Sequence, residues 1–554
     1  MSLPKQVFLS LLVLEVFVNF SGIAVPFFSN DPALYAAISK TMVQKNDFIN
    51  LYVYGIDWLD KPHFPFWMAA ISFKMFGVAE WSYRLPALLF ILLGAFYTYL
   101  LAKKLYNISV AQISVLVLLS AQHLIMSNTD VRAEPYLLAL IVGAIYHFYK
   151  LFERFGFLHL ILGSMLAACA VMTKGIFALV PIGTAILGHA VFTNQFRCFL
   201  KWRWLMAIIL IAVFILPEVY AVYLQFDRHP EKFVFNRTAV SGVKWFLWDS
   251  QFSRFIMQGP IVRSRGDVFY YVHTLLWAYA PWCLVFYYVF AQRIIAIFRR
   301  RKVEEYVTLS AIIPMLLFFS LSKFQLNFYT NILFPFFSIL VASFVSSSLS
   351  KTETRFYSGV QIFYSVVFII GAIVINFLLH PLYQWMYFGG GVLLIFCSMV
   401  ISNQTISPNL KWMIISCLSV LYINFYLNFT LYPKMSSLKG ENQAAAYVNQ
   451  FYPNQKLGVF ENRRNGFEFY SQQPVRQIDL EKWMAGEGQD RIFYVDDIVF
   501  EEIISKQGKF AILKEFDDHT SENVMKFLKS KDQPSHKSYL IRSGNSVSMI
   551  NYRQ

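Results

Sequence analysis

Apolar segments of about 20 residues recur along this chain as far as about residue 432, and they constrain its fold more than any other feature. A helix needs about this length to cross the hydrocarbon core of a bilayer. The composition agrees, because 57% of the 554 residues are hydrophobic and only 15% are charged, whereas soluble domains are roughly half apolar and a quarter charged. The sequence therefore predicts an α-helical polytopic membrane protein.

About thirteen membrane spans can be placed from hydropathy and from the breaks between apolar runs. They lie at about 7–28, 82–102, 108–126, 135–149, 157–173, 175–192, 204–226, 268–292, 305–322, 326–347, 357–379, 384–402 and 410–432. The first segment has no clear small-residue cleavage site, so we interpret it as an uncleaved span rather than as a signal peptide. Its acidic residue, Glu15, is interpreted as a side chain that reaches the membrane interface rather than as a functional intramembrane acid.

Basic residues gather in alternate loops between the predicted spans. The positive-inside rule places these loops in the cytoplasm, together with Lys5 at the N-terminus. An odd number of spans then places residues 433–554 on the opposite side. The net charge of +15 is expected from such loops, so it does not indicate nucleic-acid binding. The cytoplasmic loops are marked by Lys103 and Lys104, Lys150 and Arg154, Arg197 with Lys201 and Arg203, Arg293 with Arg299–Lys302, Lys351 with Arg355, and Lys411.

The composition changes abruptly after residue 432, which ends the predicted transmembrane domain, 1–432, and the region 433–554 is polar. Short β-type runs alternate there with helical stretches such as Gly440–Gln450, so we predict a small soluble α/β domain outside the cytoplasm. The β-type runs are Lys456–Phe460, Arg491–Val495, Phe510–Leu513 and Ser538–Ile541. The cysteines show no paired spacing and indicate neither a disulfide framework nor a thiolate metal site. They are Cys169, Cys198, Cys283, Cys397 and Cys417.

The predicted topology places the first loop, 29–81, and the long loop 227–267 on one non-cytoplasmic face, together with several short turns. Carboxylates and cations gather there, which suits group transfer from a phosphorylated lipid. The cations would bind the phosphate and stabilise its departing charge, while a carboxylate would activate the attacking hydroxyl or amine. The residues on this face are Asp31, Asp60, Lys61, His63, Arg132, Glu134, Lys174, Arg254, Arg263, Arg265 and the turn Lys323–Gln325.

Each of these residues also has a simpler interpretation. Asp31 followed by Pro32 is an ordinary helix start, with Asp as the N-cap and Pro in the first turn. The others then become structural features: a solvated pair at Asp60 and Lys61, a helix-end pair at Arg132 and Glu134, a tight turn at Lys174 and Gly175, and an interfacial histidine at His63. No HExxH, glycine-rich phosphate loop or GxSxG motif indicates a soluble enzyme.

A series of short motifs follows Asp31 along the chain. They are DWLDKPHFPFW (57–67), FGVAEWSYRLPALL (76–89), DVRAEPYLL (130–138), MTKGIFALVP (172–181), SRF (253–255), AYAPW (278–282) and FFSLSKFQLNFY (318–329). In this order they resemble the polyprenyl-phosphate-dependent GT-C glycosyltransferases, and in particular the branch of the lipid A aminoarabinose transferase and the bacterial protein mannosyltransferases. The motif match is spread across about the first 340 residues, and the later spans and the C-terminal domain match only in general layout. Because each motif is short, the resemblance rests on their order.

The resemblance implies an inverting transfer of a sugar from a polyprenyl phosphate to a lipid, glycan or protein acceptor, at the outer face of the bacterial inner membrane. Asp31 matches the catalytic aspartate of the first loop, which is expected to activate or position the acceptor. Glu134 and Asp60 match the acids of two further motifs and are also expected to be catalytic. The donor phosphate is expected to bind Lys61, Arg132, Arg254, Arg263 and Arg265.

This chain departs from the family pattern in three places. Pro32 stands where the family often has a second acid in the first-loop motif. Residues Ile261–Arg265 include no histidine, although the aminoarabinose transferase has a metal-binding histidine in this loop. The turn Gln325–Tyr329 lacks the cation and the histidine common in the family. We therefore expect no cofactor, although Asp60 and His63 leave a divalent-metal site open, and the departures bear on the substrate more than on the reaction class.

Two other functions stay open from the sequence alone. The chain could be a lipid or sugar transporter or flippase, which would carry charges or broken helices at mid-membrane. Glu15 is nearly alone in such a position, so the charges at one face favour an interfacial enzyme. A non-enzymatic receptor or scaffold would depend on residues 433–554 alone.

Overall fold

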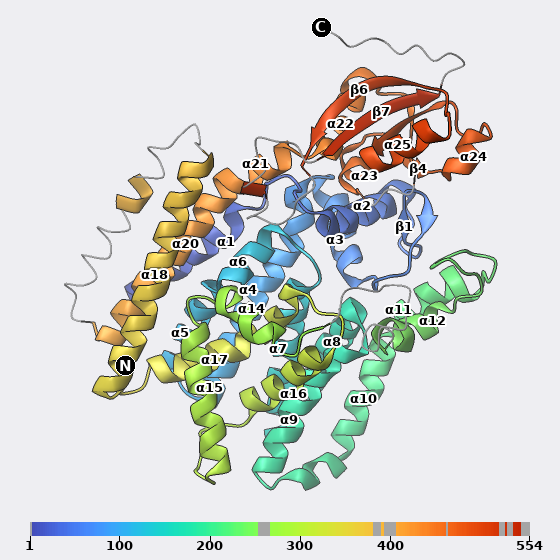
Figure 1. Ribbon diagram of the computed structural model, residues 1–554. Helices are drawn as coiled ribbons and strands as arrows, with labels where there is room; N and C mark the ends of the chain where they lie inside the picture. Colours follow the sequence, from blue (N-terminus) through green and yellow to red (C-terminus); the bar gives the residue numbers. More distant parts are fainter. Residues whose placement is uncertain are drawn as a thin grey trace. The chain divides into compact units, whose positions relative to one another are not determined.

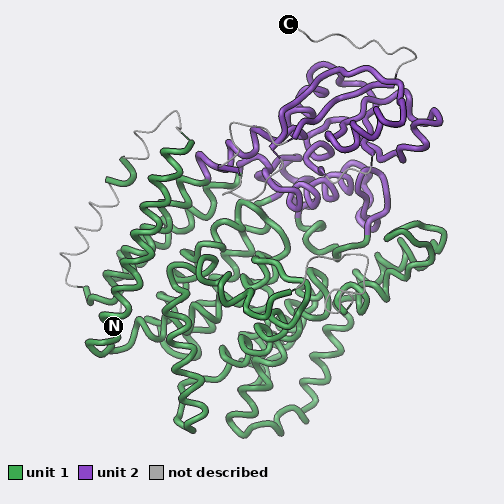
Figure 2. The backbone as a smooth tube through the Cα atoms, in the orientation of Figure 1, with its two compact units in different colours: residues 1–23, 59–68, 84–427 green, residues 24–58, 69–83, 428–554 purple. Residues whose placement is uncertain are grey.

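Helices make up most of the chain in the computed structural model (Figure 1). The structure describes residues 3–252, 266–379, 389–392, 406–460, 464–519, 527–528 and 536–543. The chain divides into two units, each built from segments distant in the sequence (Figure 2). Unit 1 comprises Met1–Ile23, Leu59–Met68 and Arg84–Leu427, and unit 2 comprises Ala24–Trp58, Ala69–Tyr83 and Asn428–Gln554. The first external loop is therefore shared between the two units. The predicted domain boundary at residue 433 instead places the whole loop in the transmembrane domain.

Unit 1 is helical, as expected where no water is present to satisfy backbone groups. Among the described residues, the helices that lie wholly or partly in it are α1 (Lys5–Ser21), α3 (Phe64–Phe76), α4 (Glu80–Leu105), α5 (Ile108–Leu119), α6 (Gln122–Thr129), α7 (Glu134–Glu153), α8 (Phe157–Lys174), η1 (Ile176–Ala178), α9 (Leu179–Phe192), η2 (Phe196–Leu200), α10 (Trp202–Phe214), α11 (Leu216–Val222), η3 (Tyr223–Asp227), α12 (Gly242–Lys244), η4 (Trp245–Asp249), α14 (Tyr270–Ala278), α15 (Cys283–Phe298), α16 (Val307–Leu321), η5 (Asn327–Leu333), α17 (Phe334–Val345), α18 (Lys351–Leu379), α20 (Pro408–Tyr426) and η6 (Leu427–Leu431).

Two helical segments lie at the centre of unit 1. In the most apolar part of α7, 83% of the residues are buried, and the share is 94% in the segment formed by η5 and α17. The shares are only 22% for Trp202–Asp227 and 17% for α18. Helices that are apolar all round and yet exposed in the protein fit a lipid surround. We conclude that α7 and α17 form the interior, while α10 and α18 face lipid.

Seven helices among the described residues are long and apolar enough to cross a membrane, and the pair α5 and α6, bent by 53°, brings the number to eight. The shorter apolar helices Ile176–Phe192, Cys283–Phe298 and Val307–Leu321 fall where further spans are predicted. The predicted span 384–402 lies mostly outside the described residues. The polytopic helical class is thus confirmed, and the count of about thirteen spans stays a prediction.

Glu15 is enclosed within the protein, whereas the sequence predicts a side chain that reaches the membrane interface. Its side chain is fully buried, and neither carboxyl oxygen has a hydrogen-bond partner among the described residues. The physical reason is its position on the helix, because Glu15 shares one face of α1 with the buried residues Leu11, Val18 and Asn19. That face packs into unit 1, where the carboxyl lies beside the thiol of Cys417.

A mixed sheet forms the core of the C-terminal part of unit 2 (Figure 1). It has five strands in the order β4-β3-β5-β7-β6. Strands β4, β3 and β5 are parallel, and β7 is antiparallel to both β5 and β6. Successive side chains of a strand point to opposite faces, so Tyr494 packs with α22 and Phe493 packs with α24 and α25. The elements of unit 2 include α2 (Asn30–Lys45), β1 (Tyr52–Val53), β2 (Ile56–Asp57), α21 (Tyr432–Ser437), α22 (Gly440–Phe451), β3 (Lys456–Val459), α23 (Gly466–Tyr470), β4 (Val475–Gln477), α24 (Leu480–Met484), β5 (Arg491–Asp496), α25 (Asp497–Ser505), β6 (Phe510–Asp518) and β7 (His536–Ser543).

The hairpin β1–β2 of the first loop inserts its turn residue, Tyr54, into this domain. The Tyr54 ring is 2% exposed and belongs to the buried cluster formed by α22, α23 and the sheet. Its hydroxyl donates to the carbonyl of Arg464 at 2.5 Å, and its backbone N–H donates to Glu468 Oε1 at 2.8 Å. Its carbonyl accepts the N–H of Gln477 at 3.0 Å. Tyr54 adopts a φ of 52°, which is uncommon for a residue other than glycine, so the tertiary contacts hold this turn in place.

Lys40 of α2 joins the first loop to the same domain at a second point. Its ammonium donates to the carbonyls of Glu468 at 2.9 Å, Phe469 at 3.0 Å and Ser471 at 2.5 Å. These groups lie at the end of α23, where backbone carbonyls lack partners within the helix. The Glu468 carboxyl is buried, and its Oε2 has no partner among the described residues.

Unit 2 should lose stability as the pH rises, because burial raises the pKa of Glu468 from 4.5 to about 8. In the folded state the carboxyl keeps a proton that the unfolded chain has already released. Its contribution is therefore complete below pH 4.5 and is lost as the pH rises through about 8. Between pH 5 and 7 the free energy of unfolding should fall by up to about 1.4 kcal/mol per pH unit. The slope should be absent in Glu468→Gln, whose amide oxygen still accepts the Tyr54 N–H.

Calorimetry of the unfolding of unit 2 from pH 5 to 7 measures this slope. Burial also lowers the pKa of Lys40 to about 8, but Lys40 is protonated in both states below pH 7 and adds no slope there. Glu481→Gln, which changes an exposed acid on α24, is the matched control. If Glu468→Gln keeps the full slope of the wild type, the pH dependence has another origin.

Candidate active site

Asp31 lies in the first turn of α2, in unit 2, and is half-buried. The N-cap of α2 is Ser29, so the simpler prediction that Asp31 caps the helix is wrong. Asp31 instead lies within the first turn of the helix. Backbone N–H groups there lack partners within the helix, so the turn favours a negatively charged side chain. Asp31 is thereby held on a regular element rather than on an irregular loop.

Asp60 and Lys61 lie in unit 1 and form an ion pair. Lys61 Nζ is 3.2 Å from the Asp60 carboxylate, and the two side chains are 18% and 22% exposed. This is a largely shielded pair, not the solvated pair of the simpler interpretation. The segment continues into α3, where the ring of Phe64 meets the ring of Tyr136 edge-on. Tyr136 lies in the first turn of α7, so this contact brings the segment that carries Lys61 close to the N-terminal end of α7, where Glu134 lies.

Arg132 and Glu134 do not form the predicted pair with each other. Arg132 Nη2 lies 3.0 Å from Asp130 Oδ2. Glu134, the first residue of α7, lies 2.5 Å from Nζ of Lys174 and is only 3% exposed. Removing one partner of such a shielded pair leaves an uncompensated charge, so Glu134 and Lys174 fix each other's positions.

A tight turn after Lys174 shapes this part of the site, as predicted. Gly175 has a φ of 99°, and a Cβ on it would lie 2.3 Å from Nε2 of Gln251. Glycine is therefore required by the backbone conformation, and a larger residue would also displace the Gln251 side chain. The Gln251 side chain donates to the carbonyl of Lys174 at 2.7 Å, which joins the end of α8 to the segment 245–252.

Two aromatic rings lie against the cations. Lys174 Nζ is 3.9 Å from the centre of the Tyr329 ring. The Arg132 guanidinium is 4.4 Å from the centre of the Phe328 ring. Contacts of this kind hold a cation over the negative face of a ring. The segment 326–329 therefore orders both cations, although it lacks the cation and histidine expected from the family pattern.

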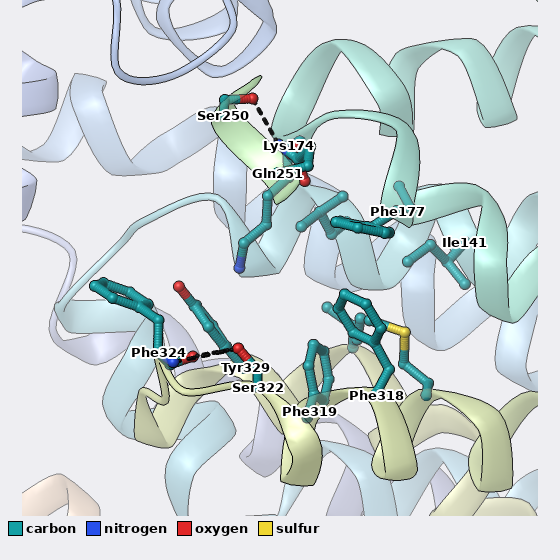
Figure 3. A pocket seen from close by; sticks show the side chains of 14 residues that line it. Ile141, Lys174, Phe177, Ser250, Gln251, Phe318, Phe319, Ser322, Phe324 and Tyr329 are labelled. Carbon is teal, nitrogen blue, oxygen red and sulfur yellow. Dashed lines mark hydrogen bonds between the residues drawn. The ribbon is translucent and has the colours of Figure 1, made fainter. Parts of the chain in front are cut away.

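A pocket opens beside Lys174 (Figure 3). Its empty volume is about 670 Å³, a value that includes space open to solvent. Its lining is mainly apolar and includes the aromatic rings of Phe177, Phe318, Phe319 and Tyr329. Among the described residues that line it, Lys174 alone carries a charge. An apolar pocket with a cation at its edge suits a ligand that combines an apolar chain with an anionic group.

The structure thus brings together part of the predicted site. Arg132, Glu134 and Lys174 lie in one group in unit 1, and Asp60 with Lys61 leads to the same end of α7. Asp31 lies in the other unit. The predicted phosphate ligands Arg254, Arg263 and Arg265 lie outside the described residues. Within the described part of the chain, no group of three or more His, Cys, Asp and Glu side chains is placed to hold a metal.

Known sequences match part of the chain, and one match includes Asp60, Lys61, Arg132, Glu134 and Lys174. Residues 60–220 match the family model described as dolichyl-phosphate-mannose-protein mannosyltransferase. The chain is 25% identical over 371 residues to undecaprenyl phosphate-alpha-4-amino-4-deoxy-L-arabinose arabinosyl transferase 2 of Proteus mirabilis, with 64% of this chain and 63% of that protein covered. For the arabinosyl transferase of Shewanella sediminis the identity is 25% over 333 residues, with 59% and 57% covered. The chain spans less than two thirds of the length of either relative.

Solved structures extend the likeness to nearly the whole chain. The crystal structure of ArnT from Cupriavidus metallidurans bound to undecaprenyl phosphate has a TM-score of 0.72 and 15% identity, with 97% of this chain and 98% of that chain covered. The oligosaccharyltransferase of Archaeoglobus fulgidus in the apo form has a TM-score of 0.51 and 12% identity, with 86% and 65% covered. This protein is therefore a multi-pass membrane protein with the fold of the GT-C glycosyltransferases. Within that fold it is similar to the aminoarabinose transferase ArnT, as the order of its motifs predicts.

Proposed function

We propose that this protein is an integral membrane glycosyltransferase that moves a sugar from a polyprenyl phosphate to an acceptor, with inversion. The observation that carries the proposal is the group of ordered cations beside an aromatic, apolar pocket in unit 1. A polyprenyl chain is apolar and its phosphate is anionic, so the pocket and its cation match both parts of the donor. The likeness to an ArnT structure that contains undecaprenyl phosphate supports this choice of lipid.

The residues then have distinct roles. Lys61, Arg132 and Lys174 contact the donor phosphate, and the arginines of the long external loop, Arg254, Arg263 and Arg265, join them. Negative charge grows on the phosphate as the bond to the sugar breaks, so fixed cations stabilise the transition state more than the bound donor. Asp60 and Glu134 hold Lys61 and Lys174 in place. Asp31 accepts the proton of the attacking hydroxyl or amine, and the scheme requires no cofactor.

We propose further that the reaction takes place at the outer face of the bacterial inner membrane, with residues 433–554 on the same side. The basic residues in alternate loops support this orientation. The names of the relatives make 4-amino-4-deoxy-L-arabinose the first sugar to test, and the resemblance of the motifs to the lipid A aminoarabinose transferase makes a lipid the first acceptor to test. Pro32 and the turn Gln325–Tyr329 differ from the family pattern, so a panel of sugars and of lipid, glycan and protein acceptors is the appropriate design.

Lys174→Met should weaken the binding of undecaprenyl phosphate about 10- to 100-fold. The substitution removes a charge-assisted contact to the phosphate and leaves the shielded Glu134 without its cation. The dissociation constant of the purified protein in lipid nanodiscs, followed by tryptophan fluorescence, measures the effect. Lys104→Met is the matched control, because Lys104 also pairs with a glutamate, Glu153 at 2.9 Å, but in a predicted cytoplasmic loop. Equal affinities for Lys174→Met and the wild type would remove Lys174 from the phosphate site.

A further inference from the structure

Glu218 of α11 holds His63, the residue two positions after Lys61, with both oxygens of its carboxylate. Oε2 accepts the backbone N–H of His63 at 2.9 Å, and Oε1 lies 2.9 Å from Nδ1 of the same residue. The two side chains are 0% and 1% exposed. The contact spans 155 positions in the sequence and joins the first loop to the apolar segment Trp202–Asp227.

This contact fixes the backbone of the loop as well as a side chain. The contact fits the imidazole tautomer in which Nδ1 of His63 carries the proton and donates it to Oε1 of Glu218, because a carboxylate oxygen accepts hydrogen bonds. The acid also receives an N–H at the start of α3, where the first backbone donors lack partners within the helix. Pro62 lies between Lys61 and His63, and it restricts Lys61 to extended backbone conformations. The position of Lys61 therefore follows from the position of His63 with little freedom.

Stability alone does not explain a buried acid–base pair at this place. An apolar pair of similar volume is often equally stable, because desolvation offsets the attraction between the charges. An ionisable residue inside an otherwise apolar segment is costly and is commonly functional. Glu218 meets that description, since it lies fully buried within Trp202–Asp227. Its carboxylate contacts His63, which lies in the same segment as the proposed phosphate ligand Lys61.

We infer that Glu218 is a positioning residue for the donor: through His63 it holds Lys61 where the lysine contacts the donor phosphate. This inference rests on the proposed function. Glu218 accepts hydrogen bonds from Nδ1 and from the backbone N–H of His63. Of Glu218, His63 and Lys61, only Lys61 contacts the donor lipid.

A double-mutant cycle on the binding of undecaprenyl phosphate tests this role. Glu218→Gln should weaken binding about 10- to 100-fold, because its amide has one acceptor oxygen where the carboxylate accepts two N–H groups of His63. In the Lys61→Ala background the same change should alter the dissociation constant less than twofold, because the lysine that it positions is gone. A general loss of stability would instead weaken binding equally in both backgrounds and would overturn the inference. Glu305→Gln is the control, since Glu305 is a buried acid that accepts bonds from Thr308 at the start of α16.

Substitutions of His63 provide a second, independent readout. Asparagine places an N–H close to the position of the imidazole Nδ1, so His63→Asn should bind the donor lipid within about threefold of the wild type. His63→Leu lacks this donor and should match Glu218→Gln. Equal losses in His63→Asn and His63→Leu would show that the ring itself is needed, which contradicts a positioning role. If the wild type binds no undecaprenyl phosphate, the proposed function itself is wrong. That outcome differs from every result described for the variants, all of which require that the wild type binds the lipid.

Discussion

Asp31→Asn is expected to lower the rate of sugar transfer about 10²- to 10⁴-fold. Asparagine has nearly the same size as aspartate but cannot take a proton from the acceptor. The change should leave unit 2 folded, because Asp31 is half-buried and is not the N-cap of α2. Loss of its charge near the start of the helix should cost only about 0.3–1 kcal/mol. A large loss of activity would therefore report on chemistry and not on folding.

Initial rates at saturating donor, for protein of verified monodispersity, measure this effect. Asp47→Asn is the matched control, because it makes the same acid-to-amide change within the same loop, at a residue whose carboxylate accepts the N–H groups of Ile49 and Asn50. It should retain most of the activity. If Asp31→Asn keeps more than a tenth of the wild-type rate, Asp31 is not the base.

Tyr54→Ala is expected to have the largest effect on stability, about 3–5 kcal/mol in unit 2. The ring is 2% exposed and fills a place in the core between α22, α23 and the sheet, so its removal leaves a cavity. Tyr54→Phe keeps the ring and loses only the hydrogen bond to the Arg464 carbonyl, which should cost about 1 kcal/mol. The difference between the two variants separates the packing of the ring from its hydroxyl.

Hydrogen exchange of the full-length protein locates this effect. Amides of α23 and β4 should exchange about 10²- to 10³-fold faster in Tyr54→Ala, because the local opening free energy falls. Tyr52→Ala changes a partly exposed tyrosine in the same hairpin and should have a much smaller effect. Unchanged exchange in Tyr54→Ala would mean that the hairpin is not anchored in the C-terminal domain.

Much of the C-terminal domain could be predicted because its strands carry a local signal. The apolar runs beginning at Lys456, Arg491, Phe510 and Ser538 coincide with β3, β5, β6 and β7. Strand β4 has only three residues, Val475–Gln477, which is too short to show an alternating pattern. The insertion of Tyr54 has no local signal at all, since the contact of its hydroxyl spans 410 positions in the sequence.

The site shows the same limit. The kinds of charge and their approximate place could be predicted, because they follow the ends of apolar segments. The pairing of the adjacent residues Asp60 and Lys61 could be predicted as well. The partner of Glu134 could not, because Glu134 pairs with Lys174, 40 positions later, and not with the nearby Arg132. Glu218 was missed because a single acid in an apolar run does not reveal that its partner is His63.

The measurement that tests the central claim most directly is an analysis of products. Purified protein in lipid nanodiscs would be incubated with a panel of polyprenyl-phosphate sugars and with a bacterial envelope extract, and the products analysed by mass spectrometry, with Asp31→Asn as the inactive control. We predict that one donor is consumed and that a new sugar adduct forms on an acceptor only with the wild type. If the folded wild-type protein binds the donor lipid and yet consumes no donor, it is not a transferase, and a transporter that carries such lipids would take its place.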